Sequence, residues 1–343
     1  MRKPNTSSST WAALAALRFF LALIIVNAHI GMIYPIGMSF FDLPDLYRFG
    51  RRLGPLAAII GFLAISGFSI AHSYSVAPTG FYLRRAVRIF PTLGFAIALY
   101  AAGLLAWGPI QTTGGVLAGM PPIPDLIAPF LALNGITHGS FLGPTWSLAV
   151  EMLFYVLTPL IALMPRPALL AAIAASATLY WFNEALGIGT FPGNFYGLSA
   201  ASLFWAWGGA FYFYRFPSWL AMVGFSLLGV TLLTRLNLEG GVWSRQVFVL
   251  TVVVIAASSL SRWRARLPER FMMYLGDLSY PLFLLHVPVI VIGNGKFGIE
   301  SASLLILIAL GLSSFCLHFI ERPIAAAVRS APLDRARRHA TVQ

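Results

Sequence analysis

Two ionisable residues share one face of the first apolar segment. Arg18 and His29 are eleven positions apart, or about three helical turns, so both point the same way and lie roughly 16 Å apart along the axis. A charge in hydrocarbon costs on the order of 2.5–3.5 kcal/mol. The pair therefore indicates an internal polar path that includes an acid–base group. The alternative is that Arg18 extends to the cytoplasmic surface and His29 hydrogen-bonds a neighbouring helix.

A carboxylate lies inside the fourth apolar segment, in the run Pro144-Thr-Trp-Ser-Leu-Ala-Val-Glu151. Few carboxylates within a membrane are passive, so Glu151 is a candidate to orient an imidazole, accept a proton or pair with an arginine. Trp146 in the same run is a candidate substrate contact. It fits the aromatic belt at the membrane interface equally well.

Three arginines precede the third apolar segment, at Arg84, Arg85 and Arg88. Arg85 and Arg88 are three positions apart and therefore share a helical face. Guanidinium groups match the geometry of phosphate, and a helix N-terminus adds a favourable partial charge. The cluster predicts binding of the phosphates of a nucleotide-like donor. Anchoring by the positive-inside rule accounts for one or two of the three.

Small and polar residues in two further segments complete the candidate site. Ser66 and Gly67 in the second segment allow close approach of a ligand or of another helix. Ser279, Tyr280 and His286 in the ninth segment are candidates for acceptor binding, and His286 also for proton transfer. We interpret Glu321-Arg322-Pro323 as a charged helix stop. No ligand spacing predicts a metal site, and the histidines at four other positions, 72, 138, 318 and 339, are interpreted as structural or incidental.

The composition is that of a polytopic membrane protein. Of 343 residues, 58% are hydrophobic and 10% charged, against about 25% charged in a typical soluble domain. The net charge of +12 would suggest nucleic-acid binding in a soluble protein, but here most basic residues fall in short loops, where topology explains them better. The one cysteine, Cys316, excludes an intrachain disulfide. The segment from Trp11 to Ile33 is too long for a signal peptide and is predicted to be a retained helix.

About ten segments are long enough to span a bilayer. Their predicted limits are 11–33, 54–76, 89–110, 143–164, 168–188, 198–214, 217–236, 245–261, 272–294 and 301–320. The sequence thus predicts an all-α fold with both termini cytoplasmic, since this orientation places most of the 23 Lys and Arg residues inside. Residues 1–328 are expected to form one membrane domain, and 329–343 a basic cytoplasmic tail.

Two stretches between these segments need separate interpretations. The apolar stretch from Leu126 to Leu133 is too short to span and is predicted to be re-entrant or interfacial. The outer cluster Arg48, Arg51 and Arg52 is interpreted as a short amphipathic helix on lipid headgroups. A contact with an anionic acceptor or lipid-linked phosphate is the alternative.

Together these motifs resemble the membrane-bound acyltransferase family 3. In order along the chain they are Arg18…His29, Phe62…Ser66-Gly67-Phe68, Arg84-Arg85…Arg88-Ile89…Pro91, Trp146-Ser147-Leu148…Glu151…Phe154-Tyr155, Leu275-Gly276…Ser279-Tyr280…His286…Pro288 and Glu321-Arg322-Pro323. Three positions depart from the family pattern: Leu93, Phe283 and His318. None of them removes a candidate catalytic group. The chain resembles the members that lack a fused SGNH-type hydrolase-like domain.

The resemblance implies transfer of an acetyl group from acetyl-CoA to a hydroxyl of a surface or lipid-linked glycan, by a multi-pass protein of the inner membrane. In that interpretation Arg84, Arg85 and Arg88 hold the CoA phosphates, with Ser66 and Gly67 nearby. Arg18 holds the pantetheine or thioester region or stabilises negative charge. His29 is the general base, Glu151 orients His29 or helps to position the acceptor, and the acceptor is contacted by Trp146, Ser279, Tyr280 and His286. Acetyl-CoA acts as a substrate, so no permanently bound cofactor is expected.

Two other classes of function remain open from the sequence. A proton-coupled transporter or flippase would use Arg18, His29 and Glu151 as a proton relay, although the two matching halves common in transporters are not visible. A scaffold in a glycan-assembly complex leaves the ordered polar motifs unexplained. The sequence leaves open the acceptor, the acyl group, an acyl-histidine intermediate and the oligomeric state.

Overall fold

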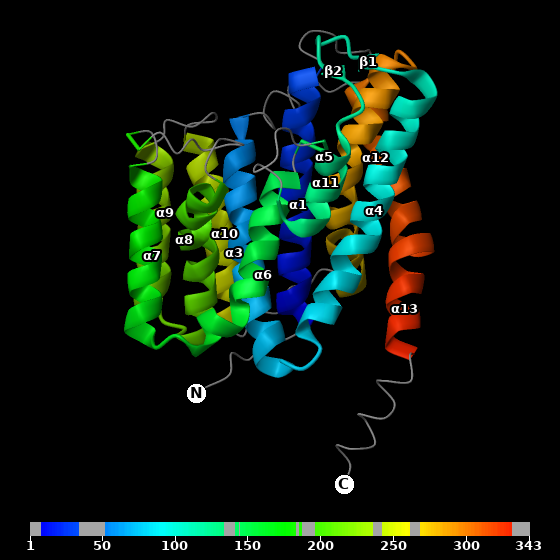
Figure 1. Cartoon of the computed structure of the whole chain (residues 1–343). Helices are drawn as coiled ribbons and strands as arrows, with labels where there is room; N and C mark the ends of the chain where they lie inside the picture. The colour runs from blue at the N-terminus through cyan, green and yellow to red at the C-terminus, as the bar shows by residue number, and fades with distance from the viewer. Residues whose placement is uncertain are drawn as a thin grey trace.

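The computed structural model is a bundle of helices, seen from the side in Figure 1, and it describes residues 8–33, 52–133, 141–143, 145–182, 185–186, 196–235, 242–260 and 268–330. The long helices are α1 (Ser8–Ile33), α3 (Pro55–Val76), α4 (Phe81–Trp107), α6 (Thr145–Leu163), α7 (Arg166–Trp181), α8 (Tyr196–Arg215), α9 (Trp219–Arg235), α10 (Val242–Leu260), α11 (Glu269–Gly295) and α12 (Ala302–Cys316). Between α4 and α6 lie strands β1 (Ile110–Gln111) and β2 (Leu117–Ala118), helix α5 (Ile123–Ile127) and the 3-10 turn η1 (Ala128–Leu131).

Each of the ten predicted segments lies on a helix. Among the described residues, seven helices are long and apolar enough to cross a membrane, on α1, α3, α4, α6, α10, α11 and the continuous stretch Ala302–Val328. Helix α9 is apolar but has only 17 residues. The prediction of an all-α membrane protein is therefore confirmed. Ten crossings and cytoplasmic termini stay predictions.

The start of α1 and the end of α13 lie at the same end of the bundle (Figure 1). We call this end the termini face. The turn from α3 to α4 also lies there (Figure 1), so Arg84 and Arg85 belong to this face. That placement agrees with the prediction that the arginines and both chain termini share one side. The loop arginines Arg48 and Arg51 and the tail 331–343 lie outside the described residues, and Arg52 is exposed.

Helix α4 begins at Phe81, eight residues earlier than predicted. Gly80 precedes it with a left-handed backbone, φ +73°, and its carbonyl accepts a hydrogen bond from the Arg84 amide at 3.0 Å. The charged residues lowered the local hydropathy, which hid the first two turns of the helix. As a result all three arginines are helical, and their side chains point in directions set by the helix.

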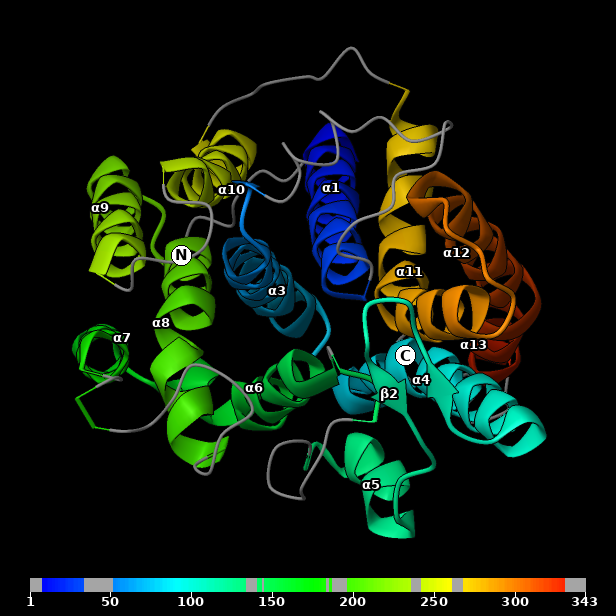
Figure 2. The ribbon, with the colours of Figure 1, turned by 90° about the horizontal axis from the view of Figure 1, so that it is seen from above.

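Five helices, α1, α3, α4, α6 and α11, lie around the centre of the bundle, seen from above in Figure 2. Helices α7 to α10 lie beyond α3, and α12 and α13 lie outside α11 and α4 (Figure 2). Close approaches hold this arrangement. A Cβ on Gly276 of α11 would lie 2.4 Å from that of Ala15 on α1, and one on Gly67 of α3 would lie 2.0 Å from the Trp207 carbonyl oxygen of α8.

The apolar stretch from Leu126 to Leu133 forms the end of α5 and the turn η1, and it does not run the length of the bundle (Figure 1). The ring of Phe130 lies 6.3 Å from that of Phe90 on α4. The prediction that this stretch is too short to span is confirmed. Whether it is re-entrant or interfacial stays a prediction.

The interpretation of Glu321-Arg322-Pro323 as a helix stop is wrong. After α12 the chain passes through the π-helical turn η2 (Leu317–Glu321) and continues as α13 (Arg322–Ser330). A proline in a helix interior loses one backbone hydrogen bond and crowds the preceding turn. Here Pro323 is the second residue of α13, directly after the wider π turn, where that conflict is small.

Candidate active site

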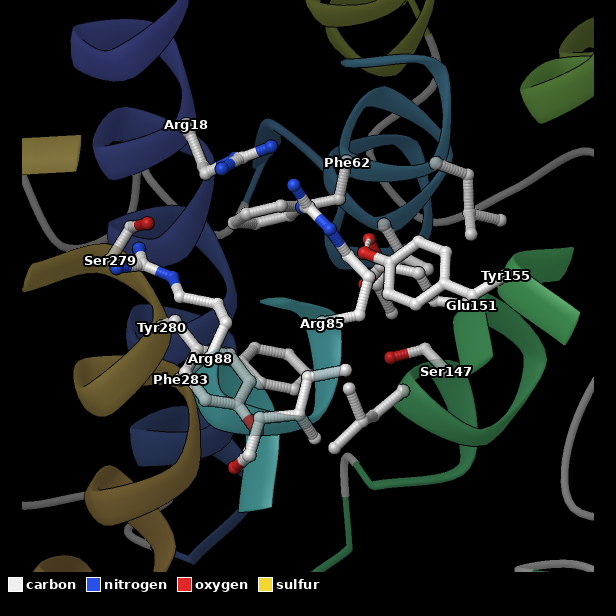
Figure 3. Close-up of a pocket in the computed structure, with 14 residues that line it drawn as sticks. Arg18, Phe62, Arg85, Arg88, Ser147, Glu151, Tyr155, Ser279, Tyr280 and Phe283 are labelled. Carbon is white, nitrogen blue, oxygen red and sulfur yellow. Dashed lines mark hydrogen bonds between the residues drawn. The ribbon is translucent and has the colours of Figure 1, made fainter. Parts of the chain in front are cut away.

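A cavity of about 780 Å³, including its open mouth, lies among the five central helices. The side chains at its wall come from α1, α3, α4, α6 and α11 (Figure 3). Six of the sequence-predicted site residues meet there: Arg18, Arg85, Arg88, Glu151, Ser279 and Tyr280. The remaining lining residues include Ser147, Tyr155 and an apolar group, Ile59, Phe62, Leu63, Leu148, Ile89 and Phe283.

Arg18 points at this cavity from the middle of α1 (Figure 3). Within the described part of the chain, no residue forms a hydrogen bond or a salt bridge with its guanidinium. Glu151 faces it across the cavity and is the main favourable charge near it. A guanidinium without a bonded partner in such a place is suited to an anionic group of a ligand.

Arg85 enters the cavity from the second turn of α4. One of its terminal nitrogens donates to the Ser73 hydroxyl at 3.1 Å, while its buried Nε has no hydrogen-bond partner among the described residues. The guanidinium carbon lies 5.8 Å from the ring centroid of Phe81 and 6.0 Å from that of Tyr155. These neutral partners orient Arg85 without cancelling its charge.

Arg88 is held by carboxylates that the sequence analysis did not assign to the site. Its Nη1 lies 2.5 Å from Glu321 Oε1 and 3.6 Å from Asp277 Oδ1. The Thr92 hydroxyl donates to the other Glu321 oxygen at 3.3 Å. Glu321 is only 4% exposed. The pair therefore fixes Arg88 in direction and leaves less of its charge for a ligand.

Glu151 has a tyrosine as its hydrogen-bond partner. The Tyr155 hydroxyl, one turn further along α6, donates to Glu151 Oε1, and it lies 3.4 Å from the Ser66 hydroxyl. No described hydrogen bond joins Glu151 to His29. Ser66 thus stands behind Tyr155 outside the cavity wall, and Gly67 faces α8.

The two histidines form a separate pair deeper in the bundle, and neither lines the cavity. The ring centroids of His29 on α1 and His286 on α11 are 5.0 Å apart, in an edge-to-face arrangement. Each ring uses Nδ1 to contact a carbonyl one turn earlier, that of Ile25 at 2.8 Å and that of Leu282 at 3.1 Å. Because a carbonyl only accepts, Nδ1 carries the hydrogen of each neutral ring, and Nε2 keeps the lone pair of a base.

Two further predicted residues, Arg84 and Trp146, also lie outside the cavity. Arg84 is exposed, and its guanidinium donates to the Thr79 carbonyl at 2.8 Å and to the Ala77 carbonyl, which caps the turn before α4. Trp146 is partly buried next to the cavity residue Ser147 but does not line the cavity itself. Arg84 turns away because its guanidinium bonds back to these two carbonyls, although it shares a helical face with Arg88.

The arrangement is a cationic cavity with a single carboxylate facing it, and a pair of imidazoles beyond its apolar end. Arginine and an imidazole base are the groups that acyl transfer uses, to stabilise an oxyanion and to move a proton. Within the described ranges, no three His, Cys, Asp or Glu side chains come together as metal ligands. Cys316 is buried beside Thr92.

Comparison with known proteins gives two matches. A family described as an acyltransferase domain matches residues 11–320. Nodulation protein 10 of Rhizobium leguminosarum bv. viciae is 25% identical over 263 residues, which cover 66% of this chain and 70% of that protein. No solved structure gives a significant match. Neither match supports the transporter alternative.

Proposed function

The chain belongs to the acyltransferase domain family that matches residues 11–320 and is a membrane acyltransferase, and from this premise we propose that it moves an acetyl group from acetyl-CoA to a hydroxyl of a surface or lipid-linked glycan. The observation that carries the proposal is the cavity into which Arg18 and Arg85 project with no bonded carboxylate among the described residues. In this proposal the protein works in the inner membrane, with the termini face in the cytoplasm.

The donor enters from the termini face. Arg85 meets an anionic part of CoA, and Arg18 lies further along α1, where it holds the pantetheine region of the donor so that the thioester points toward the histidines. Arg88 also lines the cavity, and Glu321 and Asp277 hold its guanidinium in one orientation. Arg84 is exposed and outside the cavity, which supports a role limited to guiding the donor at the surface.

The acceptor hydroxyl is activated by His29. Its Nε2 takes the hydroxyl proton while the oxygen attacks the thioester carbonyl, the C–S bond breaks, and the thiolate of CoA takes the proton back from the imidazolium. Ser279 and Tyr280 contact the acceptor at the cavity wall. Glu151, paired with Tyr155, supplies the negative charge opposite the arginines and positions the acceptor rather than His29.

Binding of acetyl-CoA to the detergent-purified protein tests the donor site. Arg85→Gln removes a charge-assisted contact worth about 1.5–3 kcal/mol, so we expect the dissociation constant to rise about tenfold or more. Arg84→Gln is the matched control, because Arg84 is an adjacent arginine outside the cavity, and it is expected to bind nearly as tightly as the wild type. No binding by folded wild type, or equal losses in both variants, would contradict the proposal.

A further inference from the structure

Two phenyl rings stand between the cavity and the histidine pair. Phe62 and Phe283 line the cavity from α3 and α11 (Figure 3), with ring centroids 6.1 Å apart. The Phe283 ring also lies 6.3 Å from the ring of His286, which in turn lies 5.0 Å from that of His29. The contacts therefore run from Phe62 through Phe283 to the two imidazoles. We call Phe62 and Phe283 the aromatic septum.

The spacing along α11 places Phe283 directly between the two regions. Tyr280, Phe283 and His286 follow one another at intervals of three residues, so Phe283 is the neighbour of both Tyr280 and His286 on successive turns. Tyr280 and Phe283 line the cavity, whereas His286 is completely buried beyond them. Phe283 is 8% exposed.

Apolar side chains also fill the way along α1. Ala22 and Ile25 lie on the helix face between Arg18 and His29, and both are fully buried. His286 Nε2 is buried with no hydrogen-bond partner in the described part of the chain. A buried acceptor without a partner is costly, on the order of 1–3 kcal/mol. His286 is thus kept dry, with a lone pair ready for a proton that must come from outside, and His29 beside it is partly exposed.

We propose that Phe283, packed on Phe62, is a specificity-determining residue that keeps the histidine pair away from a bound thioester and its water until the acceptor is present. The proposal rests on the proposed function. Without the septum, His29 Nε2 takes a proton from water, the water oxygen attacks the thioester carbonyl, and the C–S bond breaks. The products are a carboxylic acid and CoA, whose thiolate takes the proton. The Phe283 ring therefore favours acyl transfer to the acceptor over hydrolysis of the donor.

Release of CoA in the absence of any acceptor tests the septum. Phe283→Ala opens the way from the cavity to His286, so we expect acceptor-independent hydrolysis of acetyl-CoA to rise about tenfold. Adding His29→Ala to this variant is expected to remove the rise. Phe283→Tyr keeps the ring and is expected to hydrolyse as slowly as the wild type. Phe95→Ala is the matched control, because Phe95 is a half-buried phenylalanine on α4 that contacts Phe315 outside the cavity.

A second measurement does not depend on turnover. Carbethoxylation of His286 by diethyl pyrocarbonate, mapped on peptides, should rise several-fold in Phe283→Ala and stay low in the wild type and in Phe95→Ala. Unchanged hydrolysis or unchanged labelling in a Phe283→Ala protein that binds acetyl-CoA like the wild type would overturn the septum and leave the proposed function standing. Failure of the wild type to bind acetyl-CoA is the separate result that overturns the proposed function.

Discussion

The three arginines at the cavity wall differ in how their charge is balanced. Arg88 is bonded to Glu321 and lies near Asp277, whereas Arg85 has only neutral partners and Arg18 has no bonded partner among the described residues. A ligand phosphate or oxyanion gains most from a guanidinium whose charge is not already paired. We therefore assign the anion contacts to Arg18 and Arg85. Arg88 has a structural role, because its ion pair holds it in one orientation.

The pair of Glu151 and Tyr155 gives a prediction about coupled residues. Glu151→Ala and Tyr155→Phe each remove one partner of the same hydrogen bond, so each is expected to lower turnover of acetyl-CoA about tenfold. The double variant is expected to lose little more than either single variant, because the shared bond is already gone. Steady-state rates of the four proteins form the cycle. Losses that multiply fully in the double variant would show that the two side chains act independently.

Much of this site follows from the sequence, because helical periodicity alone places Arg85 and Arg88 on one face. The meeting of Arg18 with Glu151 also agrees with the prediction of a polar path inside the bundle. The separation of His29 from the cavity could not be predicted. It depends on the side-chain packing of Phe283 against Phe62, which no periodicity encodes.

Helix α3 packs tightly on α8, and Gly67 makes this possible. The sequence analysis assigned Gly67 to the donor site and kept helix packing as the alternative, and the structure places it against the Trp207 backbone. Motif spacing identifies a small residue but does not tell a ligand from a neighbouring helix, since both need the same free space.

Substitutions at two glycines test this packing. Gly67→Ala would put a Cβ 2.0 Å from the Trp207 carbonyl oxygen, so we expect a loss on the order of 1–3 kcal/mol and a melting temperature in detergent lower by several degrees. Gly224→Ala on α9 is the control, because a Cβ there meets no atom within 4 Å. That variant should melt at or slightly above the wild-type temperature. Equal melting of both variants with the wild type would refute the close approach.

The last helix illustrates what sequence patterns miss at the level of elements. Pro323 and the adjacent charges are typical of a helix end, yet the π turn before them lets the chain continue as α13. Through this turn Glu321 enters the bundle and reaches Arg88, 233 positions earlier in the chain. Contacts between residues so far apart follow from tertiary packing, so a single sequence does not reveal them.

The site residues follow one another from the termini face toward the opposite face of the bundle. Arg85 lies near the termini face, Arg18 is further along α1, and the histidine pair follows about three turns beyond Arg18, on the way to the opposite face. In the proposed function, the donor enters from the side of the chain termini. The acceptor comes from the other side, where it meets the histidines first and then Ser279 and Tyr280 at the cavity wall.

Membrane vesicles of opposite orientation test this direction. With the glycan acceptor present in the vesicles, inverted vesicles, which expose the cytoplasmic face, should release CoA from added acetyl-CoA. Intact right-side-out vesicles should release little because the donor does not cross the bilayer. Permeabilising the right-side-out vesicles should restore the rate. Faster release by intact right-side-out vesicles would reverse the predicted orientation of the bundle.

The most direct test of the central claim is CoA release by inverted vesicles that contain the glycan acceptor and either the wild type or Arg18→Gln, at equal amounts of folded protein. Arg18 lies at the point where the donor cavity meets α1, and Gln keeps polarity without the charge. Our account predicts release by the wild type and a rate lower by about tenfold or more in Arg18→Gln. Equal rates in the two, or no release by the wild type, would contradict it.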